Sequence, residues 1–107
     1  MILKVVVEDQ VYPVTVPDEI VRDGEDFFGK LDRDMDKGWQ MSRDWIDNPD
    51  LEQRCQIVGD KMLTAMHNND QRLMLLLSAY VLNRVPNVTA IRIDTNGEML
   101  ETELVTG

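Results

Sequence analysis

The sequence has little of what disulfide-stabilised, secreted or membrane-spanning proteins require. Its one cysteine, Cys55, excludes an internal disulfide framework. The longest mostly apolar run, residues 73–82, is too short to span a bilayer. The apolar run 2–7 contains Lys4 and leads into acidic residues, which is unlike a signal peptide. We therefore expect a soluble cytoplasmic protein with no membrane partner.

Glycine and serine are missing from the places where cofactor-binding and catalytic motifs need them. Gly24, Gly29 and Gly38 match neither the dinucleotide-binding spacing nor the phosphate-loop spacing. Ser42 and Ser78 lack the small neighbours that expose a nucleophilic serine. The sequence thus indicates no catalytic residue and no cofactor, and an enzyme is less favoured than a binding protein.

The one histidine, His67, has no partner that would give it chemistry. Cys55 and His67 are twelve residues apart on what should be one helix, which separates them by about 18 Å and keeps a thiol from its base. Cys55 falls on an apolar stripe and is expected in the core. His67 is expected at a helix end, near the last carbonyls, and a lone histidine makes a poor metal site.

Clusters of basic residues are also missing, and acidic residues dominate the charge. The net charge is −9, with nine acids against four bases in residues 23–50 and four acids with no base in residues 94–107. The rest of the chain is balanced. A phosphate backbone is bound by clustered Lys and Arg, so nucleic acid is not an expected partner.

The acidic run that begins at Asp32 resembles the opening of an EF-hand calcium loop. Asp32, Asp34 and Asp36 supply the acids at positions one, three and five. However, Lys37 occupies the glycine position and Arg43 stands where the bidentate acid belongs. Alternate residues of a helix point about 200° apart and cannot converge on one ion. We expect a solvated acidic face and no metal site.

What the sequence does contain is a strand-like hairpin near each end. Residues 2–16 alternate between apolar and polar side chains and predict two strands joined at Asp9-Gln10. Pro13 cannot donate a ladder hydrogen bond, so the second strand should lie at a sheet edge. The shared apolar face should consist of Leu3, Val5, Val7, Tyr12, Val14 and Val16.

Helical periodicity fills the middle of the chain. The first helix should follow a cap at Asp23 and run from about Phe27 to Ile46, unless Gly38 divides it. The second should begin at Asn48-Pro49-Asp50, and the third should cover about 70–83. The apolar stripe of the second helix consists of Leu51, Cys55, Val58, Met62, Ala65 and Met66.

The second hairpin turns on Asn96-Gly97, a strong short-range turn signal. This turn would place Arg92 opposite Glu101. Residues 1–107 are thus expected to form a single α+β domain, a two-layer sandwich of order β-β-α-α-α-β-β. Its antiparallel four-stranded sheet would come from the two hairpins, with three or four helices on one face.

Both tryptophans of the chain stand close together, at Trp39 and Trp45, with Met41 between them. They are interpreted either as core residues or as a partner surface, because tryptophan dominates interface hot spots and methionine adapts to irregular partners. On one regular helix the two rings would point about 240° apart. One of them should then face inward and the other outward, unless Gly38 redirects the chain between them.

The third predicted helix is apolar nearly all round and must be central or covered by a partner. Leu76 and Tyr80 are the candidate surface of a homodimer. The leading hypothesis for function is a non-enzymatic, acidic protein-interaction or adaptor module. The alternatives are a small-ligand-binding protein or small enzyme that uses carboxylates of the acidic helix, and a structural homodimer.

Overall fold

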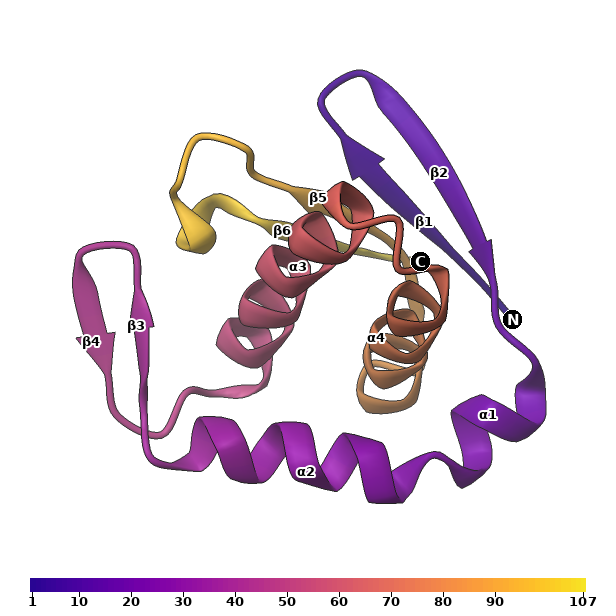
Figure 1. Ribbon diagram of the computed structural model, residues 1–107, viewed down its shortest axis with the longest axis horizontal. Helices are drawn as coiled ribbons and strands as arrows, with labels where there is room; N and C mark the ends of the chain where they lie inside the picture. The colour runs from indigo at the N-terminus through magenta and orange to yellow at the C-terminus, as the bar shows by residue number, and fades with distance from the viewer.

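The computed structural model describes residues 1–107 and has four α-helices and six strands. The α+β architecture is confirmed: α3 and α4 lie side by side in front of the sheet, and α2 crosses their lower ends (Figure 1). The strands are β1 (Ile2–Val7), β2 (Gln10–Thr15), β3 (Trp39–Met41), β4 (Asp44–Ile46), β5 (Val88–Ile93) and β6 (Glu103–Thr106). The helices are α1 (Asp18–Asp23), α2 (Glu25–Asp36), α3 (Leu51–His67), α4 (Gln71–Arg84) and the short 3₁₀ helix η1 (Met99–Glu101).

The four-stranded sheet is mixed, which corrects the prediction of an antiparallel sheet. Its strand order is β2-β1-β5-β6. The strands of each terminal hairpin are antiparallel, but β1 and β5, where the two hairpins meet, run parallel. Apolar alternation determines which face of a strand is buried and not the direction in which its neighbour runs. The sequence could therefore not distinguish the two arrangements.

The first hairpin has β2 at the sheet edge, as Pro13 predicted. Val7 pairs with Gln10, so the turn is Glu8-Asp9 and the register differs by two residues from the expected one. A shift of two keeps every side chain on its predicted face. Pro13 stands at a position where a backbone N–H would point to the free edge, away from β1, so no ladder bond is lost.

The second hairpin has a long connection in place of the predicted two-residue turn. The Oδ2 atom of Asp94 accepts the backbone N–H groups of Asn96 and Glu98, each at 2.9 Å. The short helix η1 follows before β6 begins. As a result Arg92 pairs with Glu103, where Glu101 was expected.

The helices α3 and α4 each begin at an aspartate. The carboxylate of Asp50 accepts the backbone N–H of Gln53 at 2.8 Å, and the side chain of Gln53 accepts that of Asp50 at 2.9 Å. This reciprocal capping box satisfies two N–H groups that have no partner within the helix. Asp70 caps α4 in a simpler way and accepts the N–H of Leu73 at 3.0 Å. Both helices start one or two residues later than predicted.

The segment 39–46 is the largest departure from the prediction, because it is a β-hairpin and not the second half of a helix. Helix α2 ends at Asp36, and Gly38 adopts a φ of 108° that residues with a Cβ rarely reach. The short helix α1 had not been expected. The helical periodicity that the sequence continues beyond Gly38 is a coincidence, since the residues there lie in two strands of only three residues each.

The core lies between one face of the sheet and the helices. Leu3, Val5, Ile91 and Ile93 supply the sheet side and are buried. Gly59 lets α3 approach closely, since a Cβ there would lie only 3.2–3.3 Å from side-chain atoms of Thr102 and Ile91. No helix combines the length and the apolar character needed to cross a membrane.

Candidate functional site

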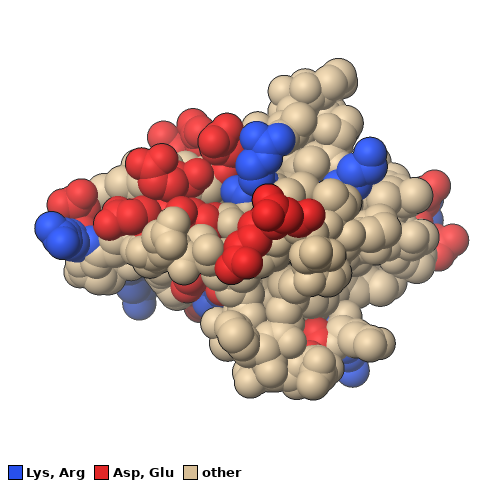
Figure 2. Space-filling view, turned by 90° about the horizontal axis from the view of Figure 1, so that it is seen from above, with Lys and Arg blue, Asp and Glu red and all other residues tan.

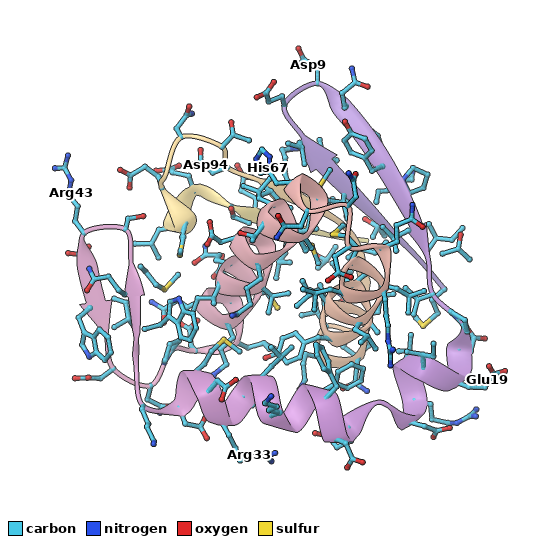
Figure 3. All side chains as sticks on the ribbon, in the orientation of Figure 1. Asp9, Glu19, Arg33, Arg43, His67 and Asp94 are labelled. Carbon is cyan, nitrogen blue, oxygen red and sulfur yellow. The ribbon has the colours of Figure 1, made fainter.

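The β3–β4 hairpin is closed by the two-residue turn Ser42-Arg43. Ser42 has a φ of 58°, in the left-handed region. Its hydroxyl donates to the carbonyl of Gly97 at 2.7 Å and accepts the N–H of Met99 at 3.0 Å. These two bonds attach the hairpin tip to the loop before η1 and offset the backbone strain at Ser42. Arg43 projects from the tip away from the body of the molecule (Figure 3).

The hairpin has an inner face that packs on the body. Trp39 and Met41 share this face, since side chains alternate along a strand. Met41 is fully buried, and Trp39 is half-buried and packs against the core. The ammonium group of Lys61 on α3 lies 4.7 Å from the centroid of the Trp39 ring, a cation–π distance. Trp39 and Met41 therefore support the hairpin.

Trp45 lies on the outer face of the same hairpin, opposite Gln40. It is 57% exposed, more than any other large hydrophobic residue of the chain. Its indole Nε1 donates to Oδ1 of Asp47 at 2.8 Å. The ring lies against Gly38, where a Cβ would come within 2.6 Å of its Cζ2 atom. Trp45 is thus held in one position while most of its surface faces solvent.

The surroundings of Trp45 are acidic. Asp44 and Asp47 are exposed beside it in the sequence, and Arg43 is the one base within residues 39–50. The face seen from above in Figure 2 also shows carboxylates gathered over one half, with few basic groups among them. A ring fixed on an acidic surface can dock in an apolar pocket whose rim carries Lys or Arg.

Asp32 of α2 is enclosed by groups from two other helices. Its Oδ1 atom accepts the hydroxyl of Tyr80 at 2.6 Å and Nη1 of Arg54 at 3.2 Å, and its Oδ2 accepts Nη2 of Arg84 at 2.7 Å. Arg84 also donates to both carboxylate oxygens of Glu25, at 2.8 and 2.9 Å. We call Asp32, Arg54, Tyr80 and Arg84 the Asp32 cluster. It ties α2 to α3 and α4.

The predicted solvated acidic face is therefore wrong for Asp32, which is partly buried, whereas Asp34 and Asp36 are exposed as predicted. Asp36 pairs with Nη2 of Arg54 at 2.8 Å, and Asp32 belongs to the Asp32 cluster. Asp34 alone is exposed and without an ion pair. No group of three or more His, Cys, Asp or Glu side chains is placed to hold a metal ion.

The electrostatics of the Asp32 cluster keep each group in its usual charge state. Burial alone would raise the pKa of Asp32, but hydrogen bonds from Tyr80, Arg84 and Arg54 outweigh it and hold that pKa below its ordinary value. Burial and the bond to Asp32 raise the pKa of Tyr80, and the bond to Glu25 raises that of Arg84. None of these pKa values is shifted toward neutral pH, so we interpret the cluster as structural.

The other candidates for chemistry are not brought together. Cys55 is fully buried, and burial raises the pKa of its thiol to about 12, so it carries no thiolate at neutral pH. His67 is exposed near the far end of α3 (Figure 3). Both residues belong to α3, as predicted, and nothing folds one onto the other.

The predicted dimer surface on the third helix is also placed inside. Tyr80 has no exposed surface and bonds Asp32, so it cannot contact a second copy. Leu76 is half-buried on the same helix. Helix α4 is apolar nearly all round because the sheet, α1 and α3 surround it.

Five hollows lie on the surface. A groove of about 580 Å³ runs between β2 and the turn from α3 to α4, with Tyr12, Met66 and Met74 among its lining residues. A smaller hollow of about 230 Å³ is lined by Asp60 of α3 and by Asp94 and other residues of the loop after β5. Neither brings a nucleophile together with a base.

Sequence analysis named Gly38 as a possible break but missed the roles of Ser42 and Asp47, which shape the site. A signal was available: the stretch from Trp39 to Ile46 alternates and has a polar pair, Ser42-Arg43, at its centre.

No protein-family model matches the chain, and no curated protein or solved structure shows significant similarity to it.

Proposed function

We propose that this protein is a non-enzymatic protein-interaction module, an adaptor or regulator within a larger assembly. Its recognition surface is the outer face of the β3–β4 hairpin, with Trp45 at the centre. Trp39 and Met41 serve this surface from the inner face, where they anchor the hairpin to α3 and the core.

The observation that carries the proposal is the combination of exposure and fixed position at Trp45. An exposed indole normally costs solubility without adding to the core. Here the indole bond to Asp47 and the contact with Gly38 hold the ring in place, so little side-chain entropy remains to be lost on binding. Such rigid aromatic anchors are typical of interface hot spots.

The acidic surroundings define the chemistry of the partner. It should present an apolar pocket for the indole, with basic residues at the rim that face Asp47. Asp44 pairs with Met41 on the inner-face side of the hairpin, so it adds negative charge near the site without lying on the outer face. Charge pairs of this kind speed association and select among partners more than they add affinity. The net charge of −9 acts in the same direction over longer distances.

The alternative of a ligand-binding protein or enzyme that uses the acidic helix has less support. Asp32 and Asp36 already bond Arg54, so their charges are compensated within the chain. Asp26 and Asp34 remain without an ion pair on that helix. They are separated by about 12 Å along the helix axis, so the two carboxylates cannot act together on one substrate bond.

The experiment is affinity capture with the wild type, Trp45→Ala and the control Tyr12→Ala. Tyr12 is also an exposed aromatic residue but lies on β2, away from the hairpin. Trp45→Ala should weaken binding of the captured protein by about 2 kcal/mol or more, while its melting temperature stays close to that of the wild type. Tyr12→Ala should bind normally. Equal capture by both variants would refute the proposed surface.

A further inference from the structure

The four-stranded sheet is covered by helices on one side only. The side chains of its other side alternate with the core residues along each strand. We call this side the open face. It consists of Ile2, Lys4, Val6, Val11, Pro13, Thr15, Ala90, Arg92, Glu103 and Val105.

The register places the apolar residues of the open face in neighbouring rows. Val11 of β2 stands beside Val6 of β1. The irregularity at Thr89 turns Val88 into the core, while Ala90 and its partner Val105 stay on the open face. The open face thus carries two apolar pairs, one on β2 and β1 and the other on β5 and β6, with Lys4 and Arg92 between them in register. Ala90 keeps only 8% of its surface exposed.

The exposure of these residues is unusual for a solvated sheet face. Ile2 is 56% exposed and Val11 is 55% exposed. Val6, next to Val11 in register, and Val105, on the other edge strand β6, are partly exposed. A sheet with one face in water normally carries polar residues there. Val6 and Val11, which are adjacent in register, form an exposed apolar pair that a second molecule can cover.

The charges of the open face differ from those of the rest of the molecule. Lys4 and Arg92 against Glu103 give it a net charge of +1, whereas the whole chain carries −9. None of these three residues has an ion pair within the chain, although Arg92 and Glu103 are neighbours in register. The open face is thus where two copies of this acidic chain can approach without strong repulsion.

The same three charges can pair between two copies. Consider a two-fold axis that runs parallel to the strands, midway between two stacked sheets. It places β1 of one copy over β5 of the other copy, and β6 of that other copy lies next to its β5. Stacked sheets lie about 10 Å apart, a gap that a lysine and a glutamate reaching from opposite sides can close. Lys4 of each copy can then meet Glu103 of the other, which gives two equivalent ion pairs.

The size of the face sets the strength of such a contact. Four strands about 4.8 Å apart and about 20 Å long span roughly 20 by 20 Å. Two such faces bury on the order of 1,000 Å² in total, at the low end of specific interfaces. A weak, concentration-dependent dimer is what this area supports.

We propose that the open face is the surface of a homodimer in which two copies pack sheet against sheet, with their helices outward. Lys4 of each copy faces Glu103 of the other, and Val6 and Val11 lie in the contact. The β3–β4 hairpin stays free in this arrangement, so the dimer presents two copies of Trp45. The inference is independent of the function proposed for the hairpin.

The first test is sedimentation of the full chain over a wide concentration range. The wild type should pass from monomer to dimer as the concentration rises, and Val11→Lys should weaken the dimer by about tenfold or more. The matched control is Tyr12→Lys, on the next residue of the same strand but on the opposite face. It should dimerise like the wild type. Circular dichroism confirms that each variant is folded.

The second test is a charge exchange. Lys4→Glu and Glu103→Lys should each weaken the dimer, because each places like charges opposite one another. The double exchange K4E/E103K should restore it. A wild type that stays monomeric at every concentration overturns the proposal, whether or not a different protein covers the face. If the Val11→Lys variant dimerises as strongly as the wild type, the proposal is also overturned. If the double exchange K4E/E103K does not restore the dimer, the pairing of Lys4 with Glu103 is rejected.

Discussion

The Asp32 cluster, centred on α2, and the β3–β4 hairpin that follows α2 in the sequence reverse the usual roles of their residue types. The cluster places a carboxylate, two guanidinium groups and a tyrosine hydroxyl between helices, where each finds a partner. The hairpin places a tryptophan outside, where the core gains little from it. Charge serves stability in the first region, and an aromatic ring is left for binding in the second.

The difference shows why residue type alone misleads in this chain. A run of aspartates suggested a solvated face, and a pair of tryptophans suggested either a core or a partner surface. Whether a side chain supports the fold or is available for binding depends on how many hydrogen-bond partners it has within the chain. Asp32 has three such partners and Trp45 has one, through its indole nitrogen. Changes at these two residues should therefore affect different measurements.

The largest expected effect on stability is that of Asp32→Ala. The change leaves Arg54 and Arg84 partly unpaired between helices and removes the acceptor of the Tyr80 hydroxyl. We expect a loss of about 2–3 kcal/mol in the free energy of unfolding, measured with urea. Asp34→Ala, two residues away on the exposed side of α2, should change it by less than about 0.5 kcal/mol. Similar losses in the two variants would show that the cluster does not hold α2.

A smaller effect is expected for Gly38→Ala, which tests how the hairpin leaves α2. The φ of 108° is unfavourable for alanine, and the new methyl group would press on the Trp45 ring. The cost should be about 1–3 kcal/mol in unfolding free energy, together with a change in tryptophan fluorescence. Gly97→Ala is the control, because Gly97 also has a positive φ but no neighbour within 4 Å of a Cβ. A silent Gly38→Ala would contradict the fixed position of Trp45.

The smallest of these effects is the pH dependence contributed by Asp32. Its pKa in the folded chain is lowered below the unfolded value, which is near 4. Its contribution to stability is therefore present above about pH 4 and is lost as the pH falls through the folded-state pKa. Glu25, whose pKa Arg84 also lowers, acts in the same direction. Urea midpoints below pH 4 should fall less steeply for Asp32→Asn than for the wild type. Equal slopes would exclude this coupling.

Much of the fold could be predicted because apolar period and turn chemistry are local properties. The face of each strand in the first hairpin followed from alternation. The buried members of the α3 stripe, Cys55, Val58, Met62 and Ala65, followed from its spacing, but Leu51 at its start is 46% exposed. Pro13 located the edge strand through its missing N–H. The parallel pairing of β1 and β5 joins segments more than eighty residues apart, and no local pattern carries that information.

The candidate site was less predictable because it depends on backbone direction at a few residues. Gly38 was recognised as a possible break, but only its positive φ turns the chain into a hairpin. Because Trp39 and Trp45 lie on two strands, the direction in which each side chain points is set by the alternation along a strand and not by the angular spacing of residues around a helix. The Asp32 cluster joins three helices, so the sequence could show its aspartate but not its partners.

The central claim is that Trp45 is free in the isolated protein and becomes covered by a partner. The most direct measurement is the fluorescence of a Trp39→Phe variant, in which Trp45 is the one remaining tryptophan. The emission should be that of an exposed indole and should be readily quenched by acrylamide. Addition of the captured protein should shift the emission to shorter wavelength and protect it from quenching. An unchanged spectrum and unchanged quenching in the complex would contradict the account.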